Sequence, residues 1–276
     1  MMQRLSNNNF LRRTIWRVGR KLYCIARGDI PNNPSTNGEY WLLDEIIRAA
    51  DQRMVMLDVC ANKGDWTLRA MGAANQCGKA LSVVAFEPCS GTRKILGDRV
   101  ARFESVQISA CALSSSEGEA EFFSSTASPG TNSLSDVSGQ HSEKVVLTTL
   151  DAFLAKAAIP HLSMLKIDTE GFDFSVLQGA NQTLAAGRVD VVQFEYNWRW
   201  LINHASLRDV FQFLKDKPYV LGKLTGTSID FYDEWHVEMD RYFENNYVLV
   251  RQDHAMIKLG VPVRFDASNC AHRMHG

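Results

Sequence analysis

Apolar residues along the chain gather in short continuous runs, separated by turns and by segments of helical spacing. Such runs are typical of strands that are buried on both faces of a parallel sheet. Strands are predicted at 54–59, 82–87, 104–109, 164–168, 189–197, 219–224 and 246–251. Helices are predicted to begin near Asp65 and Ser90 and to cover 172–186. The alternation indicates one doubly wound α/β domain.

Two segments depart from this alternation. Residues 124–143 are polar and rich in Ser and Gly, so we expect a long loop that is either functional or disordered. Residues 10–27 form a basic amphipathic helix whose apolar residues recur at helical spacing: Leu11, Ile15, Val18, Leu22 and Ile25. The favoured interpretation is a helix docked on the domain with its arginines in solvent. Contact with a membrane surface or another anionic partner is the alternative.

The breaks in the pattern predict the domain organisation. The stretch "GDIPNNPSTNG" ends the basic helix and is typical of a linker. We expect a helical arm and linker over 1–36, the α/β domain over 37–262 and a tail over 263–276. A chain of 276 residues is long enough for one such domain with extensions.

Composition narrows the class of protein. The chain is 45% hydrophobic and 22% charged with a net charge of −1, which is ordinary for a soluble globular protein and demands no nucleic acid partner. No apolar run approaches the roughly 18 residues of a membrane span, and no signal-peptide core follows the basic N-terminus. The six cysteines form no CxxC pair, which favours a reducing compartment and indicates no zinc site. We therefore expect a cytoplasmic protein, with peripheral membrane contact through residues 10–27 left open.

Four predicted strands end in a carboxylate, a pattern that packing does not require: Asp58, Glu87, Asp168 and Glu195. In doubly wound sheets the ligand lies beyond the carboxyl ends of the strands. The turn from Asp58 to Gly64 lacks the paired glycines of a dinucleotide loop, which argues against nicotinamide or flavin. S-adenosylmethionine has no phosphate and needs carboxylates for its ammonium and ribose groups. This loop therefore suits S-adenosylmethionine better, with Glu87 accepting the ribose hydroxyls.

The densest polar signal is "LKIDTEGFDF". Lys166, Asp168 and Glu170 fall at alternate positions, so on an extended strand they point to one side. Charges on one side of a buried strand either pair with one another or line a cleft. Both interpretations stay open.

Six segments occur together in an order that resembles the FkbM family of S-adenosylmethionine-dependent methyltransferases. They are "LDVCANKGDWTL", "VVAFEP", "ACALSSSEGEAEFF", "TTLDAFL", "LKIDTEGFDFSVLQGA" and "VVQFEYN", within roughly residues 54–200. The resemblance implies the class I (Rossmann-like) methyltransferase fold, a doubly wound seven-stranded sheet with its last strand antiparallel. It also implies an O-methyltransferase that acts on hydroxyls of sugars, glycolipids or related natural products.

The resemblance implies roles for single residues. Asp58, Asn62 and Gly64 would hold the methionine end of the cofactor, and Glu87, followed by Pro88, the ribose. The segment 110–113, with Ala112, would lie near the adenine, and Asp168 would close the site. The one departure is Cys60, which stands where the family usually has glycine and narrows the space for the cofactor.

Methyl transfer to an alcohol needs a positioned acceptor and a base for its proton. Asp168 and Glu195 are the favoured bases, with Glu170 as a further candidate, Lys166 as an orienting group and His204 in reserve. Acceptor recognition is expected from three aromatic or Ser/Gly-rich segments: 130–134, 196–200 and 231–236. No ligand spacing requires a metal.

Two alternatives stay open beside this hypothesis. An RNA ribose 2′-O-methyltransferase also uses a Lys-Asp-Glu set, although the core domain shows no basic face and a nucleic acid is not favoured. A non-catalytic binding module on the same fold is the other. The sequence identifies neither the acceptor nor the oligomeric state.

Overall fold

The structure is a computed structural model that describes residues 9–51, 53–124 and 141–274. Its helices are α2 (Asn9–Ala26), α3 (Glu39–Ala49), α4 (Asp65–Gln76), α5 (Ser90–Val100), α6 (Leu150–Lys156), α7 (Asp173–Gly179), α8 (Asn181–Ala185), α9 (Arg199–Ile202) and α10 (Leu207–Leu214), with short 3-10 turns η1 (Val237–Met239) and η2 (Ala255–Leu259). The strands are β1 (Met54–Val59), β2 (Leu81–Phe86), β3 (Val106–Ser109), β4 (Ala112–Leu113), β5 (Gly118–Ser124), β6 (His141–Thr148), β7 (Leu162–Ile167), β8 (Val189–Tyr196), β9 (Tyr219–Leu224), β10 (Ile229–Tyr232), β11 (Asn245–Arg251), β12 (Gly260–Phe265) and β13 (Ala271–Arg273). The predicted central strands are confirmed to within a few residues at their ends.

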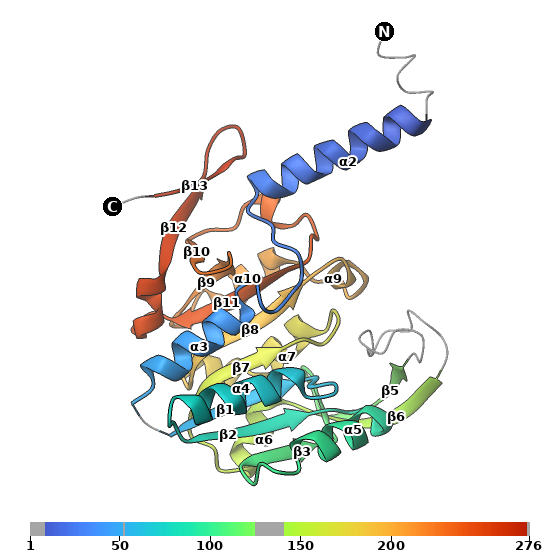
Figure 1. Cartoon of the computed structure of the whole chain (residues 1–276), viewed down its shortest axis with the longest axis vertical. Helices are drawn as coiled ribbons and strands as arrows, with labels where there is room; N and C mark the ends of the chain where they lie inside the picture. The colour runs from blue at the N-terminus through green and yellow to red at the C-terminus, as the bar shows by residue number, and fades with distance from the viewer. Residues whose placement is uncertain (1–8, 52, 125–140, 275–276) are drawn as a thin grey trace.

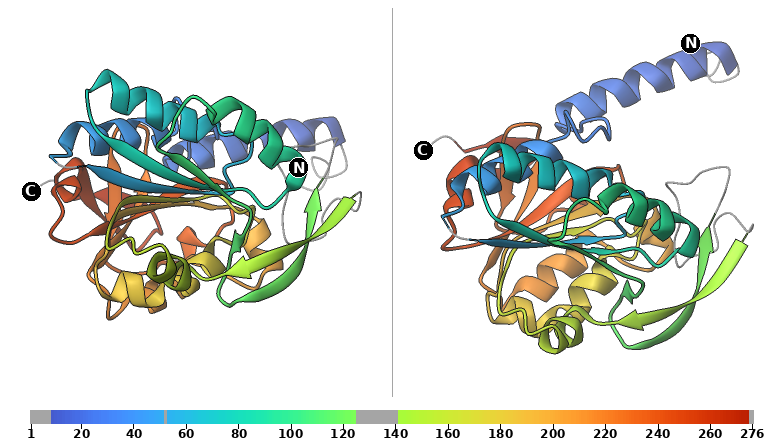
Figure 2. Two further views of the ribbon diagram at one scale, coloured as in Figure 1. Left: turned by 90° about the horizontal axis from the view of Figure 1, so that it is seen from below. Right: turned by 60° about the horizontal axis from the view of Figure 1, so that its bottom comes forward.

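One mixed sheet forms the centre of the molecule, with helices on both faces (Figures 1 and 2). Successive side chains of a strand point to opposite faces. Leu57 and Val59 therefore join one apolar cluster with α6, α7, α8 and α10, while Met54 and Met56 join a second cluster with α3 and α4. Helices on both faces explain why the central strands read as continuous apolar runs.

The strand order is β13-β12-β10-β9-β11-β8-β7-β1-β2-β3. From β8 to β3 the neighbouring strands are parallel, and β11 is antiparallel to both β8 and β9. The doubly wound fold with a late antiparallel strand is confirmed. The expected seven strands are wrong in number, because among the described residues β10, β12 and β13 extend this sheet to ten. The expected boundary between domain and tail at 263 falls inside β12.

A smaller sheet of β4, β6 and β5 stands apart from the main one. The β5–β6 hairpin projects from the body (Figure 1). The predicted loop at 124–143 is shorter at both ends, since β5 includes residue 124 and β6 begins at residue 141. Residues 125–140, including the expected acceptor segment 130–134, lie outside the described residues.

The helix predicted over 172–186 is two helices, α7 and α8. The carboxylate of Asp151 accepts the backbone N–H groups of Gln182 and Thr183, so a side chain from α6 caps the start of α8. Gly179 ends α7, and a Cβ there would lie 2.0 Å from the backbone oxygen of Ser114. The close approach to the segment after β4 is the physical reason for glycine at this position.

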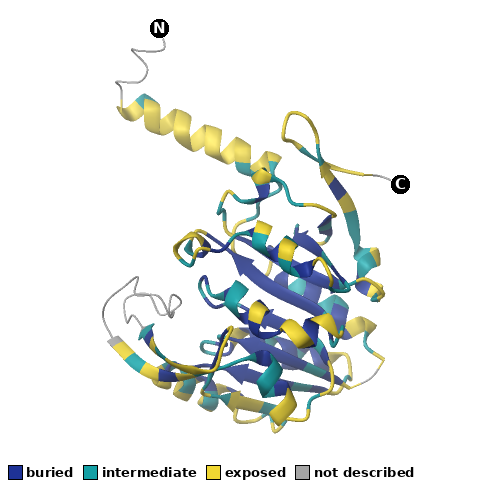
Figure 3. Ribbon diagram, turned by 180° about the vertical axis from the view of Figure 1, so that it is seen from behind, coloured by how far each residue is buried: buried dark blue, intermediate teal, exposed yellow. Residues whose placement is uncertain are grey.

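Helix α2 leaves the body and projects into solvent (Figures 1 and 3). None of its described residues is buried. The favoured interpretation of this segment, a helix docked on the domain, is therefore wrong for most of its length, since the helix contacts the body only near its C-terminal end. No helix among the described residues has the length and apolar character needed to cross a membrane.

Candidate functional site

The site lies where the carboxyl ends of β1, β2 and β7 meet. The chain runs from β1 to β2 and β3 on one side, and β7 and β8 lie on the other side of β1. In a doubly wound sheet this reversal of strand order opens a crevice beyond the strand ends. The loops after these strands, together with the segment before α3, line a cleft of about 730 Å³.

The loop after β1 has an unusual backbone. Cys60, Asn62 and Gly64 have positive φ angles of 62°, 50° and 83°. Asn and Gly tolerate this region, whereas a cysteine side chain is strained there. Gly64 caps α4, and a Cβ at that position would lie 2.5 Å from Cδ1 of Leu96. The turn and the packing against Leu96 therefore require glycine at position 64. Gly64 does not line the cleft.

Glu87 follows β2 and receives two backbone hydrogen bonds. Its carboxylate oxygens accept the N–H groups of Asn62 at 2.8 Å and of Cys89 at 2.9 Å, which fixes the side chain at the cleft. Burial raises the pKa of Glu87 to about 7, against the opposing effect of these hydrogen bonds. Pro88, the next residue, lines an adjoining pocket.

Lys166 is the centre of a buried charge cluster. Its Nζ lies 3.2 Å from Oδ2 of Asp168 and 3.6 Å from Oδ1 of Asp58. Burial lowers the pKa of the lysine, but the carboxylates of Asp168, Asp58 and Glu39 outweigh burial and raise it well above its usual value. The charges predicted at alternate positions therefore both pair and line the cleft.

Asp58 lies beneath the cleft rather than in its wall. It is fully buried and accepts a hydrogen bond of 2.7 Å from the Thr67 hydroxyl. Burial raises the pKa of Asp58 despite the nearby Lys166. Asp58 pairs with Lys166, and Lys166 in turn lines the cleft.

Glu170 comes just after β7 and lines the cleft with Asp168. Its Oε2 accepts a hydrogen bond of 2.6 Å from the Arg199 guanidinium. Burial, followed by the Asp168 charge, raises the pKa of Glu170 to about 7 against the opposing effect of Arg199. A carboxyl group with this pKa is suited to exchange protons near neutral pH.

Glu195 is held away from the cleft. Its two carboxylate oxygens accept hydrogen bonds from the side-chain amides of Asn32 at 2.8 Å and Asn197 at 2.7 Å. Burial, followed by the Asp168 charge, raises its pKa well above the usual value. The geometry therefore favours a structural role for Glu195 at the end of β8, which leaves Asp168 and Glu170 as the candidate bases.

A second, apolar pocket of about 300 Å³ adjoins the cleft. Ala112 and Pro88 line it, and Cys60 and Phe122 line both cavities. The half-buried Cys60 side chain thus lies where a polar and an apolar compartment meet. Among the described residues, no group of three or more His, Cys, Asp or Glu side chains has the geometry to hold a metal ion.

Several contributors carried no signal in the sequence. Glu39 at the start of α3 lines the cleft. Pro34 lines it too, although residues 1–36 were expected to form an arm outside the domain. Trp66 in α4 also lines the cleft, and its indole Nε1–H is buried without a hydrogen-bond partner among the described residues. No local pattern distinguishes these residues, because they reach the site through the fold.

The predicted acceptor segments diverge in the structure. Trp200 is fully buried and donates its indole N–H to the backbone oxygen of Glu195, whereas Trp198 is 47% exposed. The segment 231–236 does not line the cleft, and Phe231 is buried in the core. The exposed His204 does not line it either.

A family model described as the methyltransferase FkbM domain matches residues 58–221. The chain belongs to the FkbM methyltransferase family. The matched segment includes the end of β1 and the whole of β2, β7 and β8, the strands that build the cleft. The predictions of the family and of S-adenosylmethionine as the cofactor of a family member are confirmed.

Solved structures give weaker likenesses. A methyltransferase FkbM from Methylobacillus flagellatus KT is 15% identical with a TM-score of 0.45, and the match covers 71% of this chain and 43% of that one. An S-adenosylmethionine-dependent methyltransferase from Agrobacterium tumefaciens is 9% identical with a TM-score of 0.44, covering 81% and 64%. An rRNA methylase from Streptococcus thermophilus is 10% identical with a TM-score of 0.41, covering 76% and 93%. No protein of curated function matches the sequence. At these scores the likenesses carry no argument about activity.

The FkbM site fits S-adenosylmethionine in its chemistry. The apolar pocket suits the faces of an adenine ring, and the fixed carboxylate of Glu87 suits the two ribose hydroxyls. The cleft supplies acidic side chains for an ammonium group and a sulfonium. The buried Nε1–H of Trp66 offers a donor for the carboxylate of the methionine end.

Proposed function

We propose that this FkbM family member is an S-adenosylmethionine-dependent O-methyltransferase whose acceptor is a hydroxyl of a sugar, glycolipid or related natural product. The observation that carries the proposal is the pair of carboxylates, Asp168 and Glu170, on the wall of a cleft that continues past Glu87 into an apolar pocket. The chain spans 43% of the length of the FkbM structure it matches, so activity, acceptor and partners are proposed here for this chain.

Cofactor binding is assigned from the pocket outwards. Ala112 and Pro88 contact the adenine, Glu87 binds the ribose, and Asn62 and Trp66 hold the methionine end. Cys60 lies at the junction of the two cavities and limits the space there. Asp58 and Gly64 do not line the cleft and act indirectly. Asp58 fixes the position of Lys166, and Gly64 forms the turn before α4.

The residues of the cleft perform the acid–base part of the reaction. When bound, S-adenosylmethionine supplies a methyl group that its sulfonium activates. Glu170 would accept the proton that the acceptor hydroxyl loses on methylation, because its pKa of about 7 leaves a large fraction ionised at neutral pH. Lys166 holds Asp168 in the cleft wall, where Asp168 accepts a hydrogen bond from the acceptor.

The character of the cleft supports a neutral, hydroxyl-rich acceptor. Its lining includes the carboxylates of Glu39, Asp168 and Glu170, which accept hydrogen bonds from hydroxyls and repel phosphates. Trp198 offers an exposed ring beside the site, with the Arg199 guanidinium over it at 5.0 Å. Aromatic faces of this kind suit the apolar faces of sugars. An RNA acceptor is therefore not favoured.

Calorimetry and transfer of a labelled methyl group test the proposal. Titration with S-adenosylmethionine is expected to release heat for the wild-type protein and much less for Glu87→Gln, with Glu104→Gln as a matched control far from the site. Incubation with methyl-labelled cofactor and panels of glycans, glycolipids and RNA then identifies the acceptor class. Absence of cofactor binding would favour a binding module, and label in RNA alone would favour the ribose 2′-O-methyltransferase. The cytoplasmic location and the peripheral membrane contact expected from the sequence are proposals too.

A further inference from the structure

Helix α2 contacts the body near its C-terminal end. The Tyr23 ring lies 5.9 Å from that of Phe243, and the Arg20 guanidinium lies over the same Phe243 ring at 5.3 Å. The Tyr23 hydroxyl donates a hydrogen bond of 2.5 Å to Glu238, and Arg27, just beyond the helix, pairs with the same carboxylate. These contacts fix the direction in which the helix leaves the body.

The apolar stripe of α2 faces away from those contacts. At 3.6 residues per turn, Arg20 lies about 160° around the helix from both Val18 and Leu22, and Tyr23 lies about 140° from Val18 and about 100° from Leu22. The stripe is largely exposed: Ile15 54%, Val18 55%, Leu22 62% and Ile25 63%. Figure 3 shows the helix in the colour of exposed residues over almost its whole length. An apolar face of this extent on a surface helix requires an occupant.

The charge of α2 identifies that occupant. The helix carries five basic residues and no acidic one: Arg12, Arg13, Arg17, Arg20 and Lys21. A second copy of the helix packed on the stripe would bring two sets of like charges together, which disfavours self-association. An anionic bilayer accepts both features, since it takes up an apolar face and attracts the basic residues that flank it.

We propose that α2 lies in the interface of an anionic lipid bilayer, with Ile15, Val18, Leu22 and Ile25 inserted among the acyl chains. The helix is tethered to the body at one end, so its binding brings the whole molecule to the surface.

The segment after α2 connects this surface to the cleft. Asp29 pairs with Lys223 at 2.5 Å, Asn32 donates to Glu195, and Pro34 lines the cleft. Helix α2 projects on the same side of the molecule as the β5–β6 hairpin (Figure 1). Resting on the proposed function, this arrangement assigns a membrane-resident acceptor, whose hydroxyl reaches the cleft from the bilayer.

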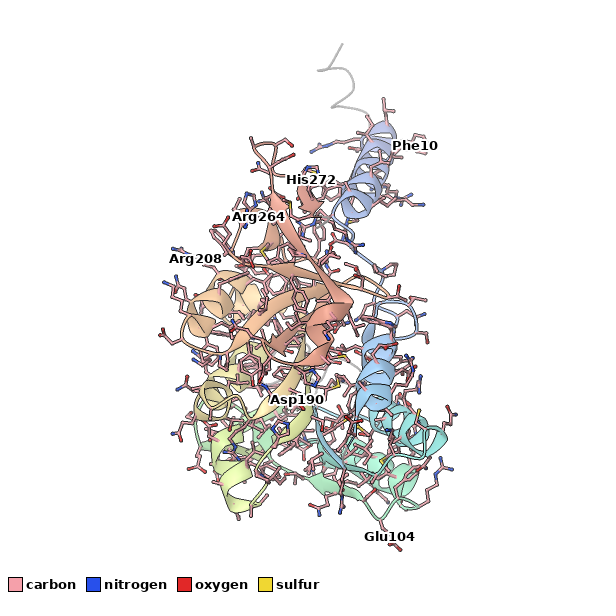
Figure 4. All side chains as sticks on the ribbon, turned by 90° about the vertical axis from the view of Figure 1, so that its left-hand side faces the viewer. Phe10, Glu104, Asp190, Arg208, Arg264 and His272 are labelled. Carbon is pink, nitrogen blue, oxygen red and sulfur yellow. The ribbon has the colours of Figure 1, made fainter. Side chains whose placement is uncertain are left out.

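Vesicle flotation with the full chain tests the lipid contact. Wild-type protein is expected to float with vesicles of phosphatidylcholine and phosphatidylglycerol and to remain below with phosphatidylcholine alone. Arg13→Gln/Arg17→Gln is expected to weaken binding by roughly 25-fold, from about fivefold for each basic residue near an anionic surface. Val18→Asp/Leu22→Asp is expected to abolish it. Lys94→Gln/Arg102→Gln makes the same charge change in and after α5 and is expected to bind like wild type. Glu104, two residues after Arg102, lies at the end of the molecule opposite to Phe10 (Figure 4).

The outcomes separate this inference from the proposed function. Unchanged flotation of Val18→Asp/Leu22→Asp, or equal loss in the Lys94/Arg102 control, overturns the lipid contact. Sedimentation that shows a dimer in wild type and a monomer in Val18→Asp/Leu22→Asp, without flotation, assigns the stripe to a second copy, and retention of RNA in place of vesicles assigns it to nucleic acid. Heat of S-adenosylmethionine binding in the same variants reports the cleft independently. The substituted side chains are exposed, so the variants are expected to fold.

Discussion

Cys60 combines a strained backbone with a position at the centre of the cofactor site. Its φ of 62° lies in the region that favours glycine, and its side chain lines both cavities. Burial, followed by the nearby Glu87 charge, raises the pKa of the thiol well above its usual value, so the side chain stays protonated. The residue therefore acts through volume and backbone strain.

Replacement of Cys60 separates these two effects. Cys60→Gly is expected to tighten S-adenosylmethionine binding and to leave the free energy of unfolding unchanged or raised by up to about 1 kcal/mol, because relief of the left-handed strain is partly offset by the flexibility of glycine in the unfolded chain. Cys60→Val, with a branched Cβ, is expected to bind S-adenosylmethionine more weakly than wild type and to have a lower free energy of unfolding. Calorimetry and thermal unfolding measure the two quantities. Weaker binding by Cys60→Gly would show that the cysteine side chain contributes to cofactor binding instead of limiting it.

Glu170 carries the proposed proton transfer, and its titration gives a signature. Because a base acts when deprotonated, kcat/KM is expected to rise with pH through about 7 and then to level off. Glu170→Gln is expected to lower the rate by about 100-fold or more and to remove this rise, with cofactor affinity nearly unchanged. Asp168→Asn serves as the comparison and should keep the rise but move it to lower pH, because the Asp168 charge contributes to the raised pKa of Glu170. A rise that survives in Glu170→Gln and is lost in Asp168→Asn would assign the base to Asp168.

At the residue scale, the sequence predicts the site residues at the ends of strands and misses those that the fold brings from elsewhere. Asp168 and Glu87 could be predicted, since the carboxyl ends of parallel strands meet at one edge. Glu39 and Pro34 could not, because each precedes or begins a helix far away in the chain and reaches the site through tertiary contact. Glu195 lies near the end of its strand as expected, but the side-chain amides of Asn32 and Asn197 bind its carboxylate oxygens and it does not line the cleft.

At the element scale, the apolar pocket depends on how closely α7 approaches the segment after β4. Gly179 lies against the backbone of Ser114, which follows Ala112 and Leu113 of the pocket wall. Backbone cannot yield as a flexible side chain does. The position of the pocket wall is therefore coupled to a helix that contributes no ligand contact itself.

Two glycine substitutions test this coupling. Gly179→Ala places a Cβ 2.0 Å from a backbone oxygen, so it is expected to cost about 2 kcal/mol or more in unfolding free energy and to weaken cofactor binding. Gly72→Ala, in the middle of α4 with open space at the Cβ position, is expected to raise the unfolding free energy by about 0.5–1 kcal/mol with no effect on binding. Denaturant unfolding and calorimetry compare the pair. Equal affinity in the two variants would contradict the coupling.

Elements inside the sheet were predictable where their apolar runs were continuous, as in β1 and β7. Strands β10, β12 and β13 were missed because they are short or half-exposed and lack such a run. The docked position expected for residues 10–27 failed for another reason. Amphipathic spacing predicts a helix and one apolar face, but it does not say whether that face is covered by the same chain.

At the scale of the whole molecule, the site concentrates buried acids whose charged forms are destabilised. Burial is the leading cause of the raised pKa values of Glu87 and Glu170, both about 7. In the unfolded chain such groups titrate near 4. A carboxyl with a raised folded-state pKa contributes stability that is full below its unfolded value and is lost as pH rises through the folded value.

The unliganded protein is therefore expected to be more stable in mild acid than in mild base. Between about pH 5.5 and about pH 8, the free energy of unfolding should fall by about 2 kcal/mol or more. Glu87→Gln is expected to reduce the slope of the unfolding free energy against pH. The reduction corresponds to at most one bound proton, because the substitution removes one of the titrating groups. Urea titrations at the two pH values measure both slopes. Stability that increases toward pH 8 would show that these carboxyls are ionised without penalty.

The place of β11 has a consequence for how the chain folds during synthesis. Residues 245–251 insert between β8 and β9, which end at residues 196 and 224, so the strand that joins the two halves of the sheet is made after both. Until it arrives, β8 has an unpaired edge, although nearly all of this strand is buried in the folded protein, and an unpaired strand edge of this kind promotes aggregation. Chains that end before β11 are expected to depend on chaperones or to precipitate, whereas loss of β13 alone should spare the nascent core.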